Sequence, residues 1–328
     1  MVKVAVVGAT GVVGSKLIEM LEHYEIKYDE LVLFASKRSS GKEVSVGGQT
    51  YVIQELTEER TQEKFDYVVM SAGGSTSEKF APLFEESGAI VIDNSSHWRM
   101  KEDVDLIVPE INKPKLKRKI IANPNCSTIQ SVVSLKPLQD KFGVKRVHYA
   151  TYQSVSGSGE GGIRDLEEGA NGAEPTTYPH PIYNNVLPHI DDFLDDGYTK
   201  EEKKMIDETK KILEDDSIEV TATCVRVPII TSHAVQMNVT LDNEATVDEV
   251  KEAFEGFPHI IVMDNPEKNE YPTPLDAANR SEIFVGRIRK DPTLPNTFHV
   301  WCVGDNLLKG AAQNTVQILK SLMDNNNK

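Results

Sequence analysis

The N-terminal stretch, residues 2–14, constrains the fold more than any other part of the sequence. Val2–Val7 has the valine-rich composition of a buried parallel strand, and it runs directly into Gly8-Ala9-Thr10-Gly11-Val12-Val13-Gly14. An apolar helical stripe follows the turn. A strand, a glycine-rich turn and a helix in this order predict a corner that binds dinucleotide phosphates, because glycines let the backbone approach them at the helix N-terminus. The spacing G-x-x-G-x-x-G matches the usual motif only in part, so a glycine turn without a ligand stays an alternative.

The segment after the second strand bears on which cofactor the corner would take. NAD-specific folds usually place a carboxylate there for the ribose 2′-hydroxyl. Here Leu31–Ala35 is followed by Ser36-Lys37-Arg38-Ser39-Ser40-Gly41, which contains no acidic residue. An arginine flanked by hydroxyls suits a 2′-phosphate, so the sequence favours NADP over NAD. A solvated basic turn is the alternative reading.

Two domains are expected from a chain of 328 residues. Further apolar strands at 67–70 and 90–92 alternate with helices, which is typical of a Rossmann-type doubly wound parallel sheet. The second half of the chain lacks this strand–helix alternation. Its segments 218–227 and 234–241 are predicted to be strands and antiparallel neighbours, which indicates a second α+β domain with a mixed or antiparallel sheet. We expect a cofactor-binding domain of residues 1–126 plus 305–328, and a catalytic and dimerisation domain of residues 127–304.

Composition excludes several classes of partner. With 51 acidic and 36 basic residues the net charge is −15, which argues against a nucleic-acid partner and against an anionic membrane surface. The three cysteines, an odd number without metal-ligand spacing, predict neither a disulfide framework nor a metal site. No apolar run reaches the roughly 18–20 residues that span a bilayer. We therefore expect a soluble protein of a reducing compartment, the cytoplasm.

Cys126 stands where the apolar run Ile120–Ala122 breaks at Asn123-Pro124-Asn125 and a helical pattern begins. This position places the sulfur over the first turn of a helix, where unpaired N–H groups and the positive end of the dipole favour a thiolate. Cys126 is thus a candidate nucleophile. The alternative is a small hydrophobic residue at a strand–helix junction.

Other polar residues follow strand ends. Arg99 lies in a loop after a parallel strand, where open α/β sheets bind ligands, and it is either an anion binder or a surface charge. Gln153 ends a strand that precedes the glycine-rich stretch 154–162, which we expect to be a mobile loop.

Two further pairs lie downstream. Glu208 and Lys211 share one side of a helix opened by a Thr199-x-x-Glu202 capping box, and an exposed ion pair is the plain alternative. Arg226 and His233 lie seven residues apart across a proline-containing segment.

Taken together, these segments resemble the aspartate-β-semialdehyde dehydrogenase family over essentially the whole chain. Several separate motifs occur in the right order, which makes the resemblance specific. They are VGATGVVG (7–14), ASKRSSGK (35–42), DNSSHWRM (93–100), NPNCST (123–128), TYQSVSGSG (151–159), E-x-x-K (208–211), CVRVPIITSH (224–233) and VGDNLLKGAA (303–312).

The resemblance implies roles for individual residues. Cys126 corresponds to the nucleophile and His233 to the acid/base. Arg99 and Lys211 correspond to phosphate binders, whereas the amino-acid part of the substrate would contact Asn125, Gln153, Glu208 and Arg226. Cofactor contacts would come from Gly8, Thr10, Gly11, Val12, Val13, Ser36, Arg38, Ser39, Ser156, Gly157 and Asn306, the last of which can be glutamine in other members. Members are usually homodimers or homotetramers built through the second domain.

The implied reaction is the reversible, NADPH-dependent reduction of L-aspartyl-4-phosphate to L-aspartate 4-semialdehyde and phosphate through a cysteine thioester, without a metal. It belongs to lysine, threonine, methionine and diaminopimelate biosynthesis. Three alternatives are open. An N-acetyl-glutamyl-phosphate reductase would leave Glu208 without a substrate ammonium. A glyceraldehyde-3-phosphate-type dehydrogenase would carry an NAD-binding carboxylate after the second strand. A non-catalytic NADP-binding sensor would have no need of the chemical residues.

Overall fold

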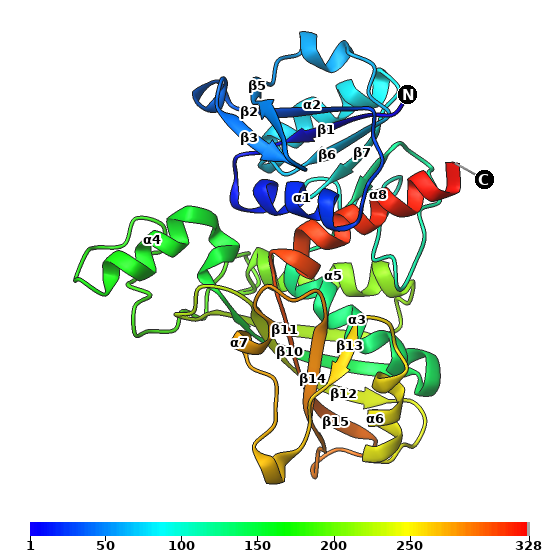
Figure 1. Ribbon diagram of the computed structural model, residues 1–328. Coiled ribbons are helices and arrows are strands. Elements are labelled where there is room, and N and C mark those ends of the chain that lie inside the picture. Colours follow the sequence, from blue (N-terminus) through cyan, green and yellow to red (C-terminus); the bar gives the residue numbers. More distant parts are fainter. Residues whose placement is uncertain (327–328) are drawn as a thin grey trace. The chain divides into compact units, whose positions relative to one another are not determined.

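The computed structural model describes residues 1–326, and Figure 1 shows its helices and strands along the chain. The chain divides into two compact units: unit 1 comprises Met1–Pro124 and Ala311–Lys328, and unit 2 comprises Asn125–Gly310. Residues 327 and 328, which the expected first domain includes, lie outside the described residues. The two units are described separately below.

Unit 1 is built on a seven-stranded sheet in which every neighbouring pair of strands is parallel. The strand order is β5-β2-β1-β6-β7-β9-β8. The first strand is central, since Val4 of β1 pairs with Leu31 on one side and with Tyr67 on the other. The strands are β1 (Lys3–Val7), β2 (Glu30–Ala35), β5 (Gln54–Glu55), β6 (Tyr67–Met70), β7 (Ile90–Asp93), β8 (Asp105–Leu106) and β9 (Ile120–Ala122). The predicted Rossmann-type sheet is confirmed.

Helices and a short hairpin complete unit 1. An aromatic cluster in its core joins β2 to α2: the rings of Phe34 and Phe84 both pack on Phe65, with centroids 5.9 and 5.8 Å away. Such edge-on pairs add to the burial of apolar area. The C-terminal helix α8 packs against α1 and β7, so the end of the chain returns to the first unit. The elements are α1 (Val12–His23), α2 (Gly74–Glu86), α8 (Gln313–Asn326), β3 (Glu43–Val46), β4 (Gln49–Val52), η1 (Lys37–Ser39) and η2 (Glu59–Gln62).

Unit 2 contains a six-stranded mixed sheet in the order β11-β10-β12-β15-β14-β13. Its outer pairs, β10 with β11 and β13 with β14, are parallel, and the inner pairs are antiparallel. The predicted mixed sheet in an α+β unit is therefore confirmed. The strands are β10 (Val144–Gln153), β11 (Glu219–Arg226), β12 (His233–Leu241), β13 (Ile260–Val262), β14 (Ile283–Lys290) and β15 (Thr297–Gly304).

One strand pairing predicted from the sequence is wrong. The segments 218–227 and 234–241 are not neighbours, because β10 lies between them and pairs with both. The connection between them contains Pro228 and does not close a hairpin. It is hydrogen-bonded instead to the end of β10 and the residues just after it, since Val227 N donates to Gln153 O and Val155 N donates to Ile229 O. Adjacency along the chain was a poor guide to pairing here.

The helices of unit 2 bury one face of its sheet and leave part of the other face exposed. On β10 the alternate residues Val147, Tyr149, Thr151 and Gln153 are buried, whereas Tyr152 on the opposite face is 40% exposed. Helix α3 packs on β10, β12, β14 and β15, and α5 packs on β11. The elements are α3 (Cys126–Phe142), α4 (Gly159–Gly169), α5 (Lys200–Leu213), α6 (Val247–Glu255), α7 (Pro274–Ala277), η3 (Val155–Ser158), η4 (Pro266–Lys268) and η5 (Leu308–Ala312).

The glycine-rich stretch 154–162 is not the mobile loop expected from its composition. It forms η3 and the first turn of α4. Helix α4 is fixed by Asp165, whose carboxylate accepts hydrogen bonds from the backbone N–H groups of Thr176, Thr177 and Tyr178. The tertiary anchor outweighs the intrinsic freedom of the glycines.

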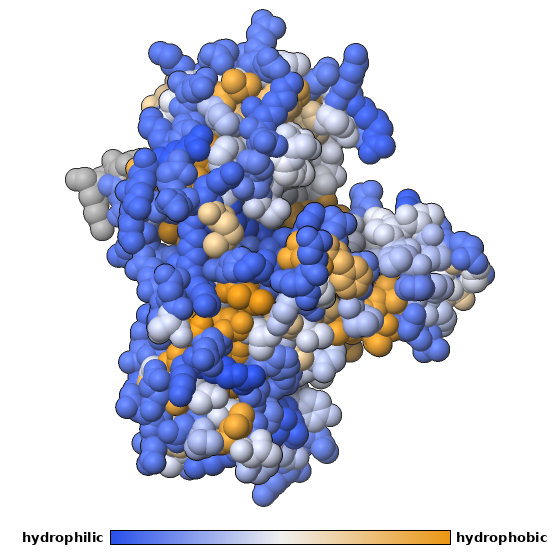
Figure 2. Space-filling model, turned by 180° about the vertical axis from the view of Figure 1, so that it is seen from behind, coloured by the Kyte–Doolittle hydropathy of each residue, from blue (hydrophilic) through white to orange (hydrophobic). Residues whose placement is uncertain are grey.

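The surface agrees with the acidic composition. Figure 2 shows hydrophilic residues over most of the visible face of the molecule.

Within residues 1–326 no helix is long and apolar enough to cross a membrane. Across the same residues, no group of three or more His, Cys, Asp or Glu side chains is arranged to hold a metal ion.

Gly14→Ala should destabilise unit 1. The added Cβ would lie 2.0 Å from the carbonyl oxygen of Gly8, a backbone atom that cannot rotate away. Overpacking of this kind costs about 1–3 kcal/mol, which exceeds the gain of about 1 kcal/mol from replacing a helical glycine. Urea unfolding measures the difference. Gly11→Ala in the same turn is the control, because its Cβ would meet only Gly8 O at 3.5 Å; equal losses in both variants would contradict the packing explanation.

Candidate functional site

The glycine turn of unit 1 contains three glycines. Two of them have no room for a side chain, and the third has room for one. Gly8 has a φ of +84°, and a Cβ there would lie 2.2 Å from Ser71 O. Gly14 is closed by Gly8 O, as described above, whereas Gly11 faces open space beyond that one carbonyl. Helix α1 begins directly afterwards at Val12, followed by Val13. Gly8 and Gly14 are therefore required by packing, and the open side at Gly11 leaves the helix N-terminus accessible to a phosphate.

The turn after β2 lies beside this corner. Thr10 Oγ1 donates to Ser39 Oγ at 3.4 Å, which brings the glycine turn and η1 together within unit 1. Ser39 is buried, whereas Ser36 and Arg38 are exposed on the same short turn. An exposed guanidinium next to two hydroxyls can bind a phosphate of a ligand held at the corner.

Arg99, also in unit 1, is buried and not the surface charge that was its alternative. Its Nε donates to Asn123 O at 3.0 Å and its Nη2 to Asn94 O at 2.9 Å. Asn123 is fixed in turn by Asn314, whose Nδ2 donates to Asn123 Oδ1 at 2.8 Å. The guanidinium is thus oriented by two backbone carbonyls in the interior of unit 1.

Cys126 is the first residue of α3, as predicted. Asn125 is the N-cap, and its Oδ1 accepts from Ser127 N at 3.0 Å and from Thr128 N at 3.1 Å. The thiol is partly exposed, unlike those of Cys224 and Cys302. At Gly310 a Cβ would lie 2.9 Å from Cys126 Cβ, so the backbone passes directly against the cysteine. A partly exposed sulfur at a capped helix start has the setting of a reactive thiol.

Helix α5 contacts the residue before the cysteine through two carboxylates. Asn125 N donates to Glu208 Oε2 at 2.6 Å, and Asn125 Nδ2 donates to Glu201 Oε1 at 2.8 Å. The same Oε1 accepts from Gln153 Nε2 at 3.0 Å. The structure therefore brings Asn125, Gln153 and Glu208 together in unit 2. Lys211 lies on α5 one turn beyond Glu208 and is half-buried.

His233 is fully buried at the start of β12. Its Nδ1 accepts from Ser154 N at 3.0 Å, so in the neutral ring Nε2 carries the hydrogen. Among the described residues, Nε2 has no hydrogen-bond partner. Burial, and then the nearby charge of Arg226, lower the pKa of His233 to about 3. A neutral imidazole with an unsatisfied N–H is a donor prepared for a ligand.

Arg226 lies close to His233. Its Nη1 donates to Ser154 O at 2.6 Å, and its guanidinium stacks 5.8 Å from the centre of the Tyr178 ring. At Gly157 a Cβ would lie 3.1 Å from Arg226 Nη1 and 3.4 Å from His233 Nε2. The absence of a side chain at Gly157 therefore leaves room beside both groups.

Asn306 connects the same region. Its Oδ1 accepts from Ser232 N at 2.9 Å and from Ser154 Oγ at 3.1 Å, and its Nδ2 donates to Ser156 Oγ at 3.0 Å. Ser156 and Gly157 are held on η3 by this network. Most of the polar atoms of Asn306 are thus engaged within the chain, and one N–H of its amide is left for a ligand.

Sequence reasoning did not identify three of the positioning residues. Glu201 lies seven residues before Glu208 on α5, a spacing that puts both carboxylates on one face and was available as a signal. Gln130 donates to His233 O at 3.1 Å and lies one turn after Cys126, so it shares that helix face. Ser154, the partner of His233, carried no signal in the sequence.

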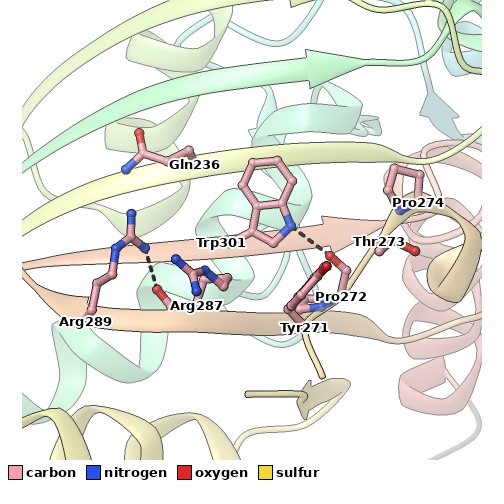
Figure 3. Close-up of a pocket in the computed structure, with 8 residues that line it drawn as sticks. All are labelled: Gln236, Tyr271, Pro272, Thr273, Pro274, Arg287, Arg289 and Trp301. Carbon is pink, nitrogen blue, oxygen red and sulfur yellow. Dashed lines mark hydrogen bonds between the residues drawn. The ribbon is translucent and has the colours of Figure 1, made fainter. Parts of the chain in front are cut away.

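A separate pocket of about 410 Å³ lies on the less covered side of the unit 2 sheet. Figure 3 shows Trp301 and the two arginines around it, with Trp301 Nε1 donating to Pro272 O at 2.9 Å. None of the site residues expected from the sequence belongs to it. It is lined by Gln236, Tyr271, Pro272, Thr273, Pro274, Arg287, Arg289 and Trp301.

Comparisons with known proteins fit this arrangement. Residues 3–119 match the family model described as semialdehyde dehydrogenase, NAD binding domain, and residues 135–309 match semialdehyde dehydrogenase, dimerisation domain. The chain therefore belongs to the semialdehyde dehydrogenases, oxidoreductases whose first domain binds a nicotinamide cofactor.

Individual relatives narrow this class. The aspartate-semialdehyde dehydrogenase of Aquifex aeolicus is 48% identical over 98% of both chains. A crystal structure of aspartate semialdehyde dehydrogenase II from Vibrio cholerae, complexed with ASA, has a TM-score of 0.94 and 41% identity, and covers 99% of this chain and 98% of its own. The Candida albicans enzyme, solved with NADP, has a TM-score of 0.77 and 28% identity, and the match covers 98% of this chain and 99% of that enzyme. Within its class, the chain belongs to the aspartate-semialdehyde dehydrogenase family, and the predicted family is confirmed.

The buried neutral state of His233 should appear in the pH dependence of stability. Its pKa is lowered from 6.5 to about 3 on folding, so the unfolded chain binds more protons between these values and stability falls as pH falls through this window. A single such group contributes about 1.4 kcal/mol per pH unit. Urea unfolding of wild type and His233→Gln at pH 7 and 5 should therefore show a shallower loss in the variant. Equal slopes would mean that His233 does not titrate as described.

Proposed function

We propose that this chain catalyses the reversible, NADPH-dependent reduction of L-aspartyl-4-phosphate to L-aspartate 4-semialdehyde and phosphate. The observation that supports it most is the setting of Cys126 in unit 2. The thiol begins a capped helix, and the same unit holds Gln153, Arg226 and the neutral His233. The expected domains, 1–126 plus 305–328 for the cofactor and 127–304 for catalysis and dimerisation, assign the two units their roles.

Cys126 would act as the nucleophile. Its thiolate attacks the β-carbonyl of the acyl phosphate, the S–C bond forms, and the C–O bond to phosphate breaks with its electron pair on the departing phosphate. The product of this half-reaction is a thioester on Cys126.

His233 would serve the second half-reaction. NADPH, when bound, supplies a hydride to the thioester carbon. The resulting tetrahedral oxyanion would accept a hydrogen bond from the Nε2–H of His233, and its collapse would break the C–S bond, returning the electron pair to the Cys126 sulfur and releasing the aldehyde. The neutral imidazole suits this step because it keeps its proton and donates at Nε2.

The remaining residues would bind the substrate. Arg99 and Lys211 bind the phosphate, and Arg226 binds the α-carboxylate through its planar fork of donors. Gln153 and Asn125 contact the substrate by their amides, and Glu208 pairs with the α-ammonium. A substrate with an acetylated amine would leave the buried Glu208 carboxylate without a cation, which disfavours N-acetyl-glutamyl phosphate.

A substrate panel tests this function. We expect purified protein to form NADPH, seen at the nicotinamide absorbance band, from aspartate semialdehyde, phosphate and NADP, and not from N-acetyl-glutamate semialdehyde. Cys126→Ser should abolish this turnover and thioester formation while retaining NADPH binding, because the cofactor corner is in the other unit. Cys224→Ala, which removes a buried thiol that the proposed mechanism does not use, is the matched control and should remain active. Turnover with the acetylated substrate alone would overturn the proposal.

We propose NADP and not NAD as the cofactor, on the basis of the exposed Arg38 between Ser36 and Ser39. The Candida albicans relative solved with NADP supports the same choice. The other contacts would come from Gly8, Thr10, Gly11, Val12, Val13, Ser156, Gly157 and Asn306.

Arg38→Ala should weaken NADPH binding by about 10- to 100-fold, the value of a lost charge-assisted hydrogen bond, and should change NADH binding little. Fluorescence titration with both cofactors measures this. Lys37→Ala, an exposed cation one position earlier, is the control and should weaken NADPH only slightly. Equal weakening of NADPH and NADH by Arg38→Ala would remove the role of Arg38 in 2′-phosphate recognition.

We further propose a homodimer, formed through the less covered face of the unit 2 sheet. Tyr152 and Trp301 lie on this face with ring centroids 5.3 Å apart, and aromatic side chains are enriched in interface cores. The dimerisation-domain model matches this unit. Sedimentation equilibrium distinguishes the dimer from a homotetramer. A cytoplasmic location is proposed with this assignment.

A further inference from the structure

Glu201 is a buried carboxylate that the proposed mechanism does not use. It is the second residue of α5 and only 5% exposed. Buried charges are expensive unless they are paired and hydrogen-bonded, so a specific arrangement must hold this one. Its neighbour Glu202 is buried as well, but Glu202 bonds only backbone, accepting from Thr199 N and Cys224 N.

The two oxygens of Glu201 serve different partners. Oε1 accepts from Asn125 Nδ2 at 2.8 Å and from Gln153 Nε2 at 3.0 Å. Oε2 pairs with Lys204 Nζ at 3.2 Å. Burial alone would raise the pKa of Glu201, but Lys204 and the two amides outweigh it and the pKa is lowered. The group is therefore ionised and can only accept hydrogen bonds.

An acceptor at this position fixes the orientation of two amides. Asn125 must turn its NH₂ toward Glu201, which leaves its Oδ1 to cap Ser127 N and Thr128 N at the start of α3. Gln153 must do the same, and its Oε1 accepts from Thr151 Oγ1 at 2.9 Å. One N–H of Gln153 is then left to contact a ligand.

We propose that Glu201 is a positioning residue of the active site: its carboxylate sets the amides of Asn125, beside the nucleophile, and Gln153, which contacts substrate. The role assigned to these two amides rests on the proposed function. Glu201 does not touch substrate and acts through its neighbours. Misplacement of catalytic groups by about 1 Å can cost about 100-fold in rate, so the consequence should be measurable.

Glutamine cannot replace Glu201 at this position. Its side chain has one acceptor oxygen, whereas Lys204 and the pair of amides together require acceptors at both ends of the group. If the oxygen faces Lys204, the new NH₂ meets the NH₂ groups of Asn125 and Gln153. If it faces the amides, the NH₂ meets the Lys204 ammonium.

The first experiment measures the rate of aspartate semialdehyde oxidation. Glu201→Gln should lower kcat by roughly 10- to 100-fold. Glu202→Gln, the adjacent buried carboxylate, is the matched control and should lower thermal stability by a similar amount while keeping kcat within about threefold of wild type. A kcat for Glu201→Gln close to that of the control would overturn the proposal.

A double-mutant cycle identifies the route of the effect. If Glu201 acts through Gln153, the loss caused by Glu201→Gln in kcat/KM should be at least threefold smaller in a Gln153→Ala background. Additive losses in this cycle would exclude action through Gln153 and overturn that part of the proposal.

A second readout does not depend on the substrate. Glu201→Asp keeps the negative charge but shortens the side chain by one methylene, so it loosens the Asn125 cap without changing local charge. Alkylation of Cys126 by iodoacetamide should slow severalfold at pH 7 relative to wild type and Glu202→Asp, because the first turn of α3 that carries the thiol is less firmly held. If wild type fails to oxidise aspartate semialdehyde, the proposed function fails, and unchanged alkylation in Glu201→Asp would overturn the positioning role separately.

Discussion

The site in unit 2 depends on how the first turn of α3 is held. Asn125 is bonded from both sides: its side chain caps α3, and its backbone N–H and its amide NH₂ are bound by two carboxylates of α5. Because these bonds join residues 76 and 83 positions apart, Cys126 keeps its place only when the packing of α5 against α3 is complete. Local helix propensity alone would not place the thiol, since a helix start frays without such contacts.

The charge pattern around this turn follows from the same contacts. Carboxylates next to a thiol oppose its ionisation. Here, however, the carboxylate of Glu201 accepts a hydrogen bond from the side-chain amide of Asn125, and that of Glu208 accepts one from its backbone N–H. Lys204 offsets the charge of Glu201 from the far side and is itself paired with Asp191 at 2.6 Å. Burial, and then the nearby charge of Arg226, lower the pKa of His233 and keep it neutral. A strongly acidic chain thus holds a cation, a neutral donor and a thiol within unit 2.

The parts of the fold and site that could be predicted were those encoded locally. The glycine corner, the helix start at Cys126 and the mixed character of the second sheet each follow from a contiguous pattern of residues, and the structure contains them. Pairing of 218–227 with 234–241 was wrong because β10, from a distant segment, enters between them. The stretch 154–162 forms η3 and the start of α4, and distant residues hold it, since Val155 N donates to Ile229 O and Ser156 N to Ile230 O. Both errors concern contacts that sequence proximity does not report.

The difference between local patterns and long-range contacts also separates the proposed reactive residues from the residues that orient them. Cys126, Arg226 and His233 can be recognised by their residue types, because few side chains carry out their chemistry. Ser154, Gln130 and Glu201 are of common types, and their importance lies in hydrogen bonds to residues 79, 103 and 76 positions away in the sequence. Ser154 N decides which nitrogen of His233 carries the hydrogen, so a backbone N–H of an ordinary serine determines whether the imidazole meets a ligand as a donor. Such control leaves no trace in composition or periodicity, and it becomes evident only when the end of β10, just before Ser154, is seen to lie beside the start of β12 at His233.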